Sequence, residues 1–149
     1  MADPSWTPSL EQVADHIPTR TRDAAQAGDT ALLGTFNSQT EPTDEQALRH
    51  IKAAVAEVLG AVGGDIPATP AFLGELAGEA AALRAAADIE LGYPNRNADA
   101  DRWAQLDQRA KDVLQRLIDA VNDAGSGPEG ALLPVYSFPD PPWHGDYHL

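Results

Sequence analysis

One alanine-dense segment, AGEAAALRAAADIEL at residues 77–91, places the strongest constraint on what this 149-residue chain can form. Six of the eight residues at 80–87 are alanine, which is the best helix former and lets two backbones approach closely. Over the whole chain 27 residues are alanine, and only 37 hydrophobic residues carry larger side chains. We therefore predict an all-α fold with a lean core, in which helices pack through small side chains.

Apolar residues at spacings of three and four predict a small helical bundle of one short N-terminal helix and three long helices. The expected helices are 10–17, 44–62, 70–91 and 99–124. The side chains expected to line the core of the three long helices are Leu48, Ile51, Val55, Val58, Val62, Leu73, Leu76, Ala80, Leu83, Ala87, Trp103, Leu106, Ala110, Val113, Leu117, Ala120 and Val121.

Capping signals mark the ends of these helices. SLEQ at 9–12 and TDEQ at 43–46 are capping boxes, in which a hydroxyl and a glutamine satisfy the first free amides. Thr69 precedes a proline that suits the first position of a helix. Gly63 and Gly125 suit the left-handed residue that follows a helix.

The chain reads as one helical domain at 9–125 with an extended segment at 1–8 before it and an extended arm at 126–149 after it. An irregular loop at 18–42 interrupts the domain, and a short strand or hairpin at 32–40 is an alternative for part of it. The arm holds five prolines and several aromatic residues but no lysine or arginine. It suits docking on a partner or packing on the chain's own helices, and both remain open.

The charge balance excludes several classes of function. The net charge of −13 opposes autonomous binding of nucleic acid and docking on anionic membranes. The chain has no cysteine, no apolar run long enough to span a bilayer and no signal-peptide pattern at its start. Phosphate-binding and nucleophile motifs are absent as well, so we expect no enzymatic activity and no cofactor.

Two features are candidate sites with competing interpretations. His144 and His148 have a spacing that could place two metal ligands on one helix face, but the prolines and glycine around them oppose a helix, and we expect no metal site. Arg20 and Arg22 are the only basic residues among the first 48. They either pair with acids of the same chain or reach an acidic surface of a partner.

Three sequence fragments carry a resemblance to a known family. They are IPTRT at 17–21, GTFNSQTEPT at 34–43 leading into a helix, and AAADIEL at 85–91 followed by Tyr93 and Pro94. In this order they resemble the head-to-tail connector (adaptor) proteins of long-tailed phages of actinobacteria. The resemblance spans roughly residues 10–121.

The resemblance implies a structural virion protein made in the host cytoplasm. Such subunits form a ring, usually twelvefold, that joins the capsid portal to the downstream neck (stopper) or tail protein and lets genomic DNA pass through. The family has no catalytic residues to carry over, and its loops and arms commonly reach the portal or neighbouring subunits. On that basis the residues expected at the portal or neighbour interface are Arg20, Arg22, Phe36, Tyr136, Phe138, Trp143 and Tyr147.

Two other functions compete with this one. The chain could be a small acidic helical module that binds a partner protein in a regulatory or scaffold role. It could also be an enzyme with an unrecognised site, which would need a cleft with clustered titratable groups.

Overall fold

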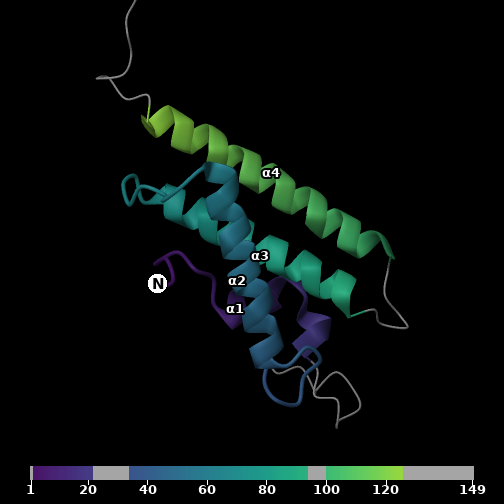
Figure 1. Cartoon of the computed structure of the whole chain (residues 1–149). Helices are drawn as coiled ribbons and strands as arrows, with labels where there is room; N and C mark the ends of the chain where they lie inside the picture. The colour runs from purple at the N-terminus through teal and green to yellow at the C-terminus, as the bar shows by residue number, and fades with distance from the viewer. Residues whose placement is uncertain (1, 22–33, 94–99, 126–149) are drawn as a thin grey trace, which may run out of the picture.

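The alanine-dense segment forms the central helix of the structure, a computed structural model that describes residues 2–21, 34–93 and 100–125 (Figure 1). The elements are α1 (Leu10–His16), a 3₁₀ turn η1 (Pro18–Thr21), α2 (Asp44–Val62), α3 (Phe72–Gly92) and α4 (Ala100–Gly125). Within these ranges the ordered elements are all helical, so the predicted all-α bundle of one short and three long helices is confirmed.

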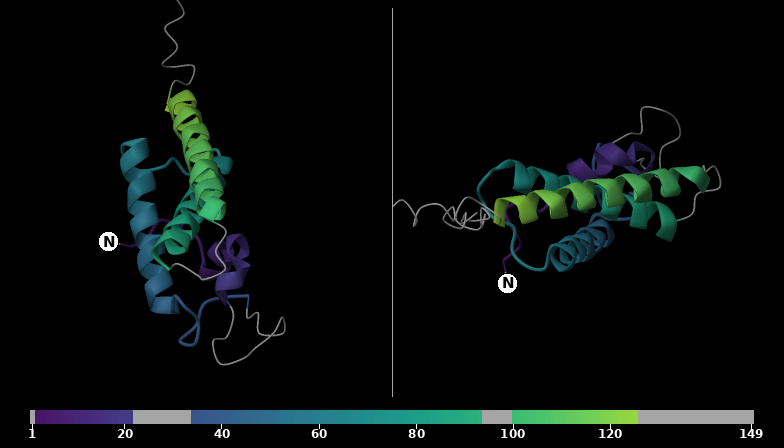
Figure 2. Two further views of the ribbon diagram at one scale, coloured as in Figure 1. Left: turned by 90° about the vertical axis from the view of Figure 1, so that its right-hand side faces the viewer. Right: turned by 90° about the horizontal axis from the view of Figure 1, so that it is seen from above.

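Helix α3 contacts every other α-helix of the described chain. Helix α4 runs antiparallel along it, α2 crosses it on another side, and α1 packs against it near η1 (Figures 1 and 2). A helix with neighbours on several sides must be apolar over most of its surface. Its buried residues are Leu73, Ala77, Ala80, Ala81, Ala82, Leu83, Ala85, Ala86, Ala87 and Ile89.

Helix α2 follows its sequence signals closely. The amide of Gln46 donates to Oγ1 of Thr43 at 3.4 Å, and the amide of Thr43 donates to Oε1 of Gln46 at 3.0 Å. Gly63 ends the helix with φ of +85°, a left-handed conformation that favours glycine. Of the side chains predicted to form the apolar stripe of this helix, only Leu48 is exposed. Its exposed fraction is 44%, so its prediction as a core residue is wrong.

The predicted start of α3 is wrong. Thr69 does not cap the helix, which begins two residues after Pro70. The amides of Leu73 and Gly74 donate to the carbonyls of Pro70 and Ala71, each at 3.1 Å. These tight-turn bonds satisfy the first amides with backbone carbonyls, so no side-chain cap is needed.

Helix α4 turns its apolar stripe toward α3. Leu106, Ala110 and Leu117 are buried as predicted, whereas Trp103 is 36% exposed and is not a core residue. Gly125 was expected just after the helix and instead forms its last residue. The helix starts at residue 100, and the predicted start at 99 lies outside the described residues.

The N-terminal segment was expected to be extended, but it contains a turn. The amide and the hydroxyl of Thr7 both donate to the carbonyl of Pro4, at 3.0 and 2.7 Å. This turn carries Trp6 onto α3 at two glycines one helical turn apart. A Cβ atom built on Gly78 would lie 2.9 Å from the carbonyl oxygen of Trp6, and one on Gly74 would lie 3.7 Å from its Cβ.

Residues 34–40, the described part of the alternative strand or hairpin at 32–40, form turns, bends and irregular backbone instead of a strand. The reason is a local hydrogen-bond network around Thr40, which competes with strand pairing. Its buried hydroxyl accepts from the amide of Asn37 at 3.0 Å and donates to the carbonyl of Pro42, 2.7 Å away. The turn leads directly into the cap of α2, so this loop positions the start of that helix.

The two glycines of α3 give a matched pair of variants. Gly78→Ala should be less stable than Gly74→Ala by about 1–3 kcal/mol, because only the first places a methyl group too close to a backbone carbonyl. Gly74→Ala should be neutral or stabilising, since alanine favours the helix. Urea unfolding followed by circular dichroism measures the difference, and equal stability of the two variants would contradict the close approach.

Candidate functional site

Arg20 forms a buried ion pair with Glu90. Its Nε donates to Oε1 of Glu90 at 3.2 Å and its Nη2 donates to Oε2 at 3.0 Å. Both side chains are only 7% exposed. The two-pronged geometry matches the planar guanidinium to the carboxylate, which makes this the strong form of such a pair.

The pair ties η1 to the last turn of α3, 70 residues away along the chain. Of the two roles raised for Arg20 by the sequence, the structure therefore shows pairing with an acid of the same chain. Because its guanidinium is buried and occupied, Arg20 is not an exposed contact residue in the described chain.

Phe36 is also not an exposed contact residue. It is 3% exposed and belongs to the core cluster. Its ring anchors the loop of residues 34–43 to the helices instead of facing a partner. The remaining predicted interface residues lie outside the described ranges: Arg22, Tyr136, Phe138, Trp143 and Tyr147.

A second charged cluster, centred on Arg84 of α3, joins the three long helices. Its Nη1 lies 2.7 Å from Oδ1 of Asp107 on α4, and its Nε lies 3.0 Å from Oε2 of Glu57 on α2. The Nε contact is an ion pair without hydrogen-bond alignment. Lys111 completes the cluster with Nζ 2.6 Å from Oδ2 of Asp107.

These cations hold the pKa of the Asp107 carboxyl below its ordinary value of 3.8. The hydrogen bond from Lys111 is the largest cause, and the charges of Lys111 and Arg84 add to it against the opposing effect of desolvation. Asp107 thus stays ionised well into the acid range, which suits a structural ion pair between helices.

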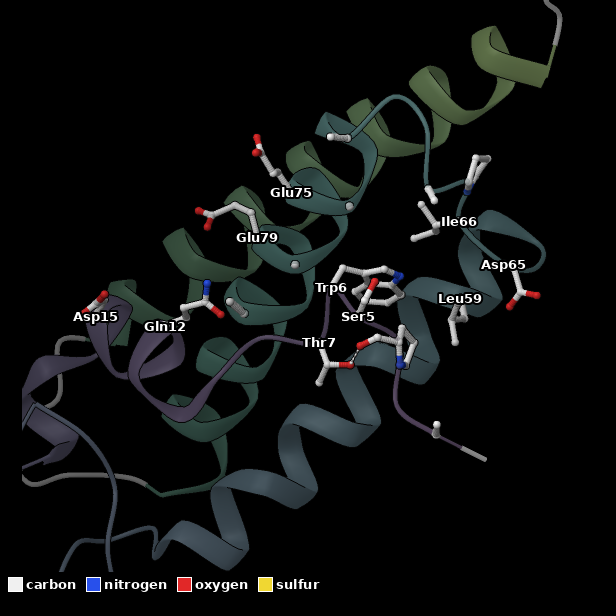
Figure 3. Close-up of a pocket in the computed structure, with 18 of the residues that line it drawn as sticks. Ser5, Trp6, Thr7, Gln12, Asp15, Leu59, Asp65, Ile66, Glu75 and Glu79 are labelled. Carbon is white, nitrogen blue, oxygen red and sulfur yellow. Dashed lines mark hydrogen bonds between the residues drawn. The ribbon is translucent and has the colours of Figure 1, made fainter.

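A large groove lies between residues 2–7, α1, the first half of α3 and the connection from α2 to α3 (Figure 3). Its volume is about 900 Å³. Trp6, Leu59 and Ile66 lie on one side of α3, and Glu75 and Glu79 extend from its other side.

The described residues give the groove acidic charge. Among them, Asp15, Asp65, Glu75 and Glu79 line it, and no lysine or arginine does. His16 is the nearest group that could become cationic, with Nε2 3.6 Å from Oε2 of Glu79. A concave surface with one sign of charge concentrates its potential and attracts ligands of the opposite sign.

Four large apolar side chains of the described chain are exposed. They are Leu48, Phe72, Leu91 and Trp103. Leu91 and Trp103, at 61% and 36% exposure, lie on the last turn of α3 and the first turn of α4, which are at the same end of the helical hairpin (Figure 1).

Across residues 2–21, 34–93 and 100–125, no three histidine or acidic side chains are placed to hold one metal ion. Within the same residues, no helix combines the length and the apolar character needed to cross a membrane. His144 and His148 lie outside the described chain, so the expectation of no metal site there stays a prediction.

Comparisons of the chain with protein-family models, with curated proteins and with solved structures found no match.

Sequence reasoning missed the groove. Glycines at 74 and 78 and glutamates at 75 and 79 repeat one helical turn apart, which is a visible signal for one open face and one acidic face on α3. What the sequence did not reveal is that Trp6, far away along the chain, folds onto the glycines and forms one wall.

Breaking the buried pair should destabilise the fold strongly. Arg20→Met leaves the Glu90 carboxylate buried without a partner and should lower the free energy of unfolding by about 3–5 kcal/mol. The double variant Arg20→Met/Glu90→Met should lose much less, because no unpaired charge remains. Urea unfolding measures both, with exposed Arg49→Met as the control that stays within about 0.5 kcal/mol of the parent. A loss under about 1 kcal/mol for Arg20→Met would contradict this role.

Asp107 should lose its contribution to the stability of the fold only at strongly acidic pH. Its pKa is lowered in the folded state, so its contribution is fully present above the ordinary carboxyl value and is lost as the pH falls through the lower folded value. The stability gap between the parent and Asp107→Asn should therefore shrink as the pH drops below 3.8. Lys111→Met should move the Asp107 pKa upward in a carboxyl NMR titration, and an unchanged titration would disprove the assigned cause.

Proposed function

We propose that this chain is a structural subunit of a phage head-to-tail connector. In this proposal it assembles as a ring, usually twelvefold in the family it resembles, between the capsid portal and the downstream neck or tail protein, and genomic DNA passes through the ring. It works by holding other proteins in place and performs no catalysis.

The main support for the proposal is that the three fragments that resemble the connector family contact one another or the same core in the structure. Arg20 of IPTRT pairs with Glu90 of AAADIEL across the fold. The loop GTFNSQTEPT inserts Phe36 into the same core and ends in the capping box of α2. Fragments that are scattered in the sequence thus act in one structural unit, which is consistent with a family signature.

The charge of the chain fits this role. A net charge of −13 repels the phosphate backbone, so a ring of such subunits would not grip DNA as it moves through. The exposed Leu91 and Trp103 supply apolar contact area at one end of the α3–α4 hairpin, where a neighbouring subunit or the portal could bury it.

The second candidate is a small acidic module that binds a partner protein outside any virion. The acidic groove beside Trp6 favours it, because a concave surface of this size suits ligand binding. This candidate predicts that the chain has no affinity for a portal.

If the proposal holds, mixing the chain with the portal protein of its phage should yield a ring-sized complex in sedimentation velocity and in negative-stain micrographs. A monomer in the absence of the portal is compatible with the proposal, since the portal can act as template. Failure to bind the portal, together with absence from the neck of intact virions, would reject the connector role in favour of the second candidate.

Two variants locate the contacts in the same assay. The first variant is a chain that ends at Gly125, and the second is Leu91→Ser/Trp103→Ser. Both should keep the helical circular dichroism of the parent. Each should reduce the mass of protein bound to the portal if the changed region contacts the portal. Arg49→Met serves as the control for a surface change elsewhere on the helices.

A further inference from the structure

We propose that the groove beside Trp6 binds an extended, basic segment of a partner protein that also carries an apolar side chain. The proposal goes beyond the connector role, because it concerns the chemistry of the occupant and holds for whichever partner carries such a segment.

The shape of the groove favours a polypeptide segment over a compact ligand. Its volume of about 900 Å³ lies near the upper end of the range for ligand sites, about 300–1,000 Å³. It is open along α3 beside the segment around Trp6, which itself packs over Gly74 and Gly78. A bound chain could therefore lie close to the helix on the part of this face that Trp6 does not cover.

The charge of the groove selects a basic occupant. Of the residues that the structure describes, four carboxylates line it, from α1, from the connection after α2 and from α3, and no lysine or arginine does. Glu75 and Glu79 are exposed and one helical turn apart, so two basic side chains of an extended segment could each meet one carboxylate.

The apolar side of the groove supplies the anchor. Trp6, Leu59 and Ile66 are half-buried and partly packed against the core, so they present fixed apolar surface. Tryptophan is among the residues that most often dominate binding energy at interfaces. An aliphatic side chain of the partner would cover this surface while its basic neighbours reach the acidic side.

A second copy of the chain is a poor occupant. Two copies, each with a net charge of −13, repel one another. Arg20, Arg84 and Arg102 are already engaged within the chain, Arg102 through a 3.2 Å hydrogen bond from Nη2 to the carbonyl of His16. The segment after residue 125 has no lysine or arginine to offer.

The test uses the full chain and a fluorescein-labelled hexapeptide of alternating arginine and leucine as the probe. Fluorescence anisotropy at low salt should show saturable binding of this peptide and none of the matched glutamate–leucine peptide. The double variant Glu75→Gln/Glu79→Gln should weaken binding at least about tenfold. The control Asp112→Asn/Asp119→Asn removes equal charge from α4, outside the groove, and should change the affinity less than about threefold.

Tryptophan fluorescence gives an independent readout. In a Trp103→Phe/Trp143→Phe background only Trp6 remains, and its emission should shift on peptide binding. Trp6→Ala should weaken binding of the labelled peptide by at least about tenfold.

Three results would overturn the proposal. Equal loss of affinity in the two charge variants would show general attraction to an acidic protein. An unchanged Trp6 spectrum at saturation would place the peptide elsewhere. Self-association in sedimentation equilibrium that Glu75→Gln/Glu79→Gln abolishes would assign the groove to a second copy.

Discussion

Close approach of the other helices to α3 is the constraint on which the rest of the structure depends. Because alanine fills most of its buried positions, the neighbouring backbones come near from several sides, and little large apolar surface is needed to close the core. Because of these close contacts, α3 determines where the other elements lie. Helix α4, helix α2 and the segment around Trp6 are each placed by what they meet on it.

A core of small side chains fixes the relative orientation of the helices only weakly, and the charged pairs help to fix it. Arg20 and Glu90 set where the chain after α1 meets the end of α3, while Arg84 reaches both α2 and α4 from the middle of α3. A buried pair gives little net stability compared with apolar residues of similar volume. Here the pair fixes the position of one element relative to another, because a guanidinium and a carboxylate satisfy one another in few relative positions.

Local signals in the sequence predicted most of the fold. Both capping boxes and the left-handed Gly63 depend on neighbours within a few residues, so they could be read directly. Leu48 and Trp103 were misplaced because periodicity finds a stripe but not how far the partner helix extends along it. Arg20, Phe36 and the groove depend on contacts between distant parts of the chain, which a single sequence does not encode in any local pattern.

The fold of Trp6 onto the glycines of α3 has a practical consequence for handling the protein. One wall of the groove is the first described stretch of the polypeptide, held by a single turn and by backbone proximity. An affinity tag fused ahead of it would begin close to Ala2, which lines the groove, and a polyhistidine tag would bring there imidazoles that become cationic below about pH 6.5. Recombinant material for binding work should therefore carry its tag at the other terminus or have it removed.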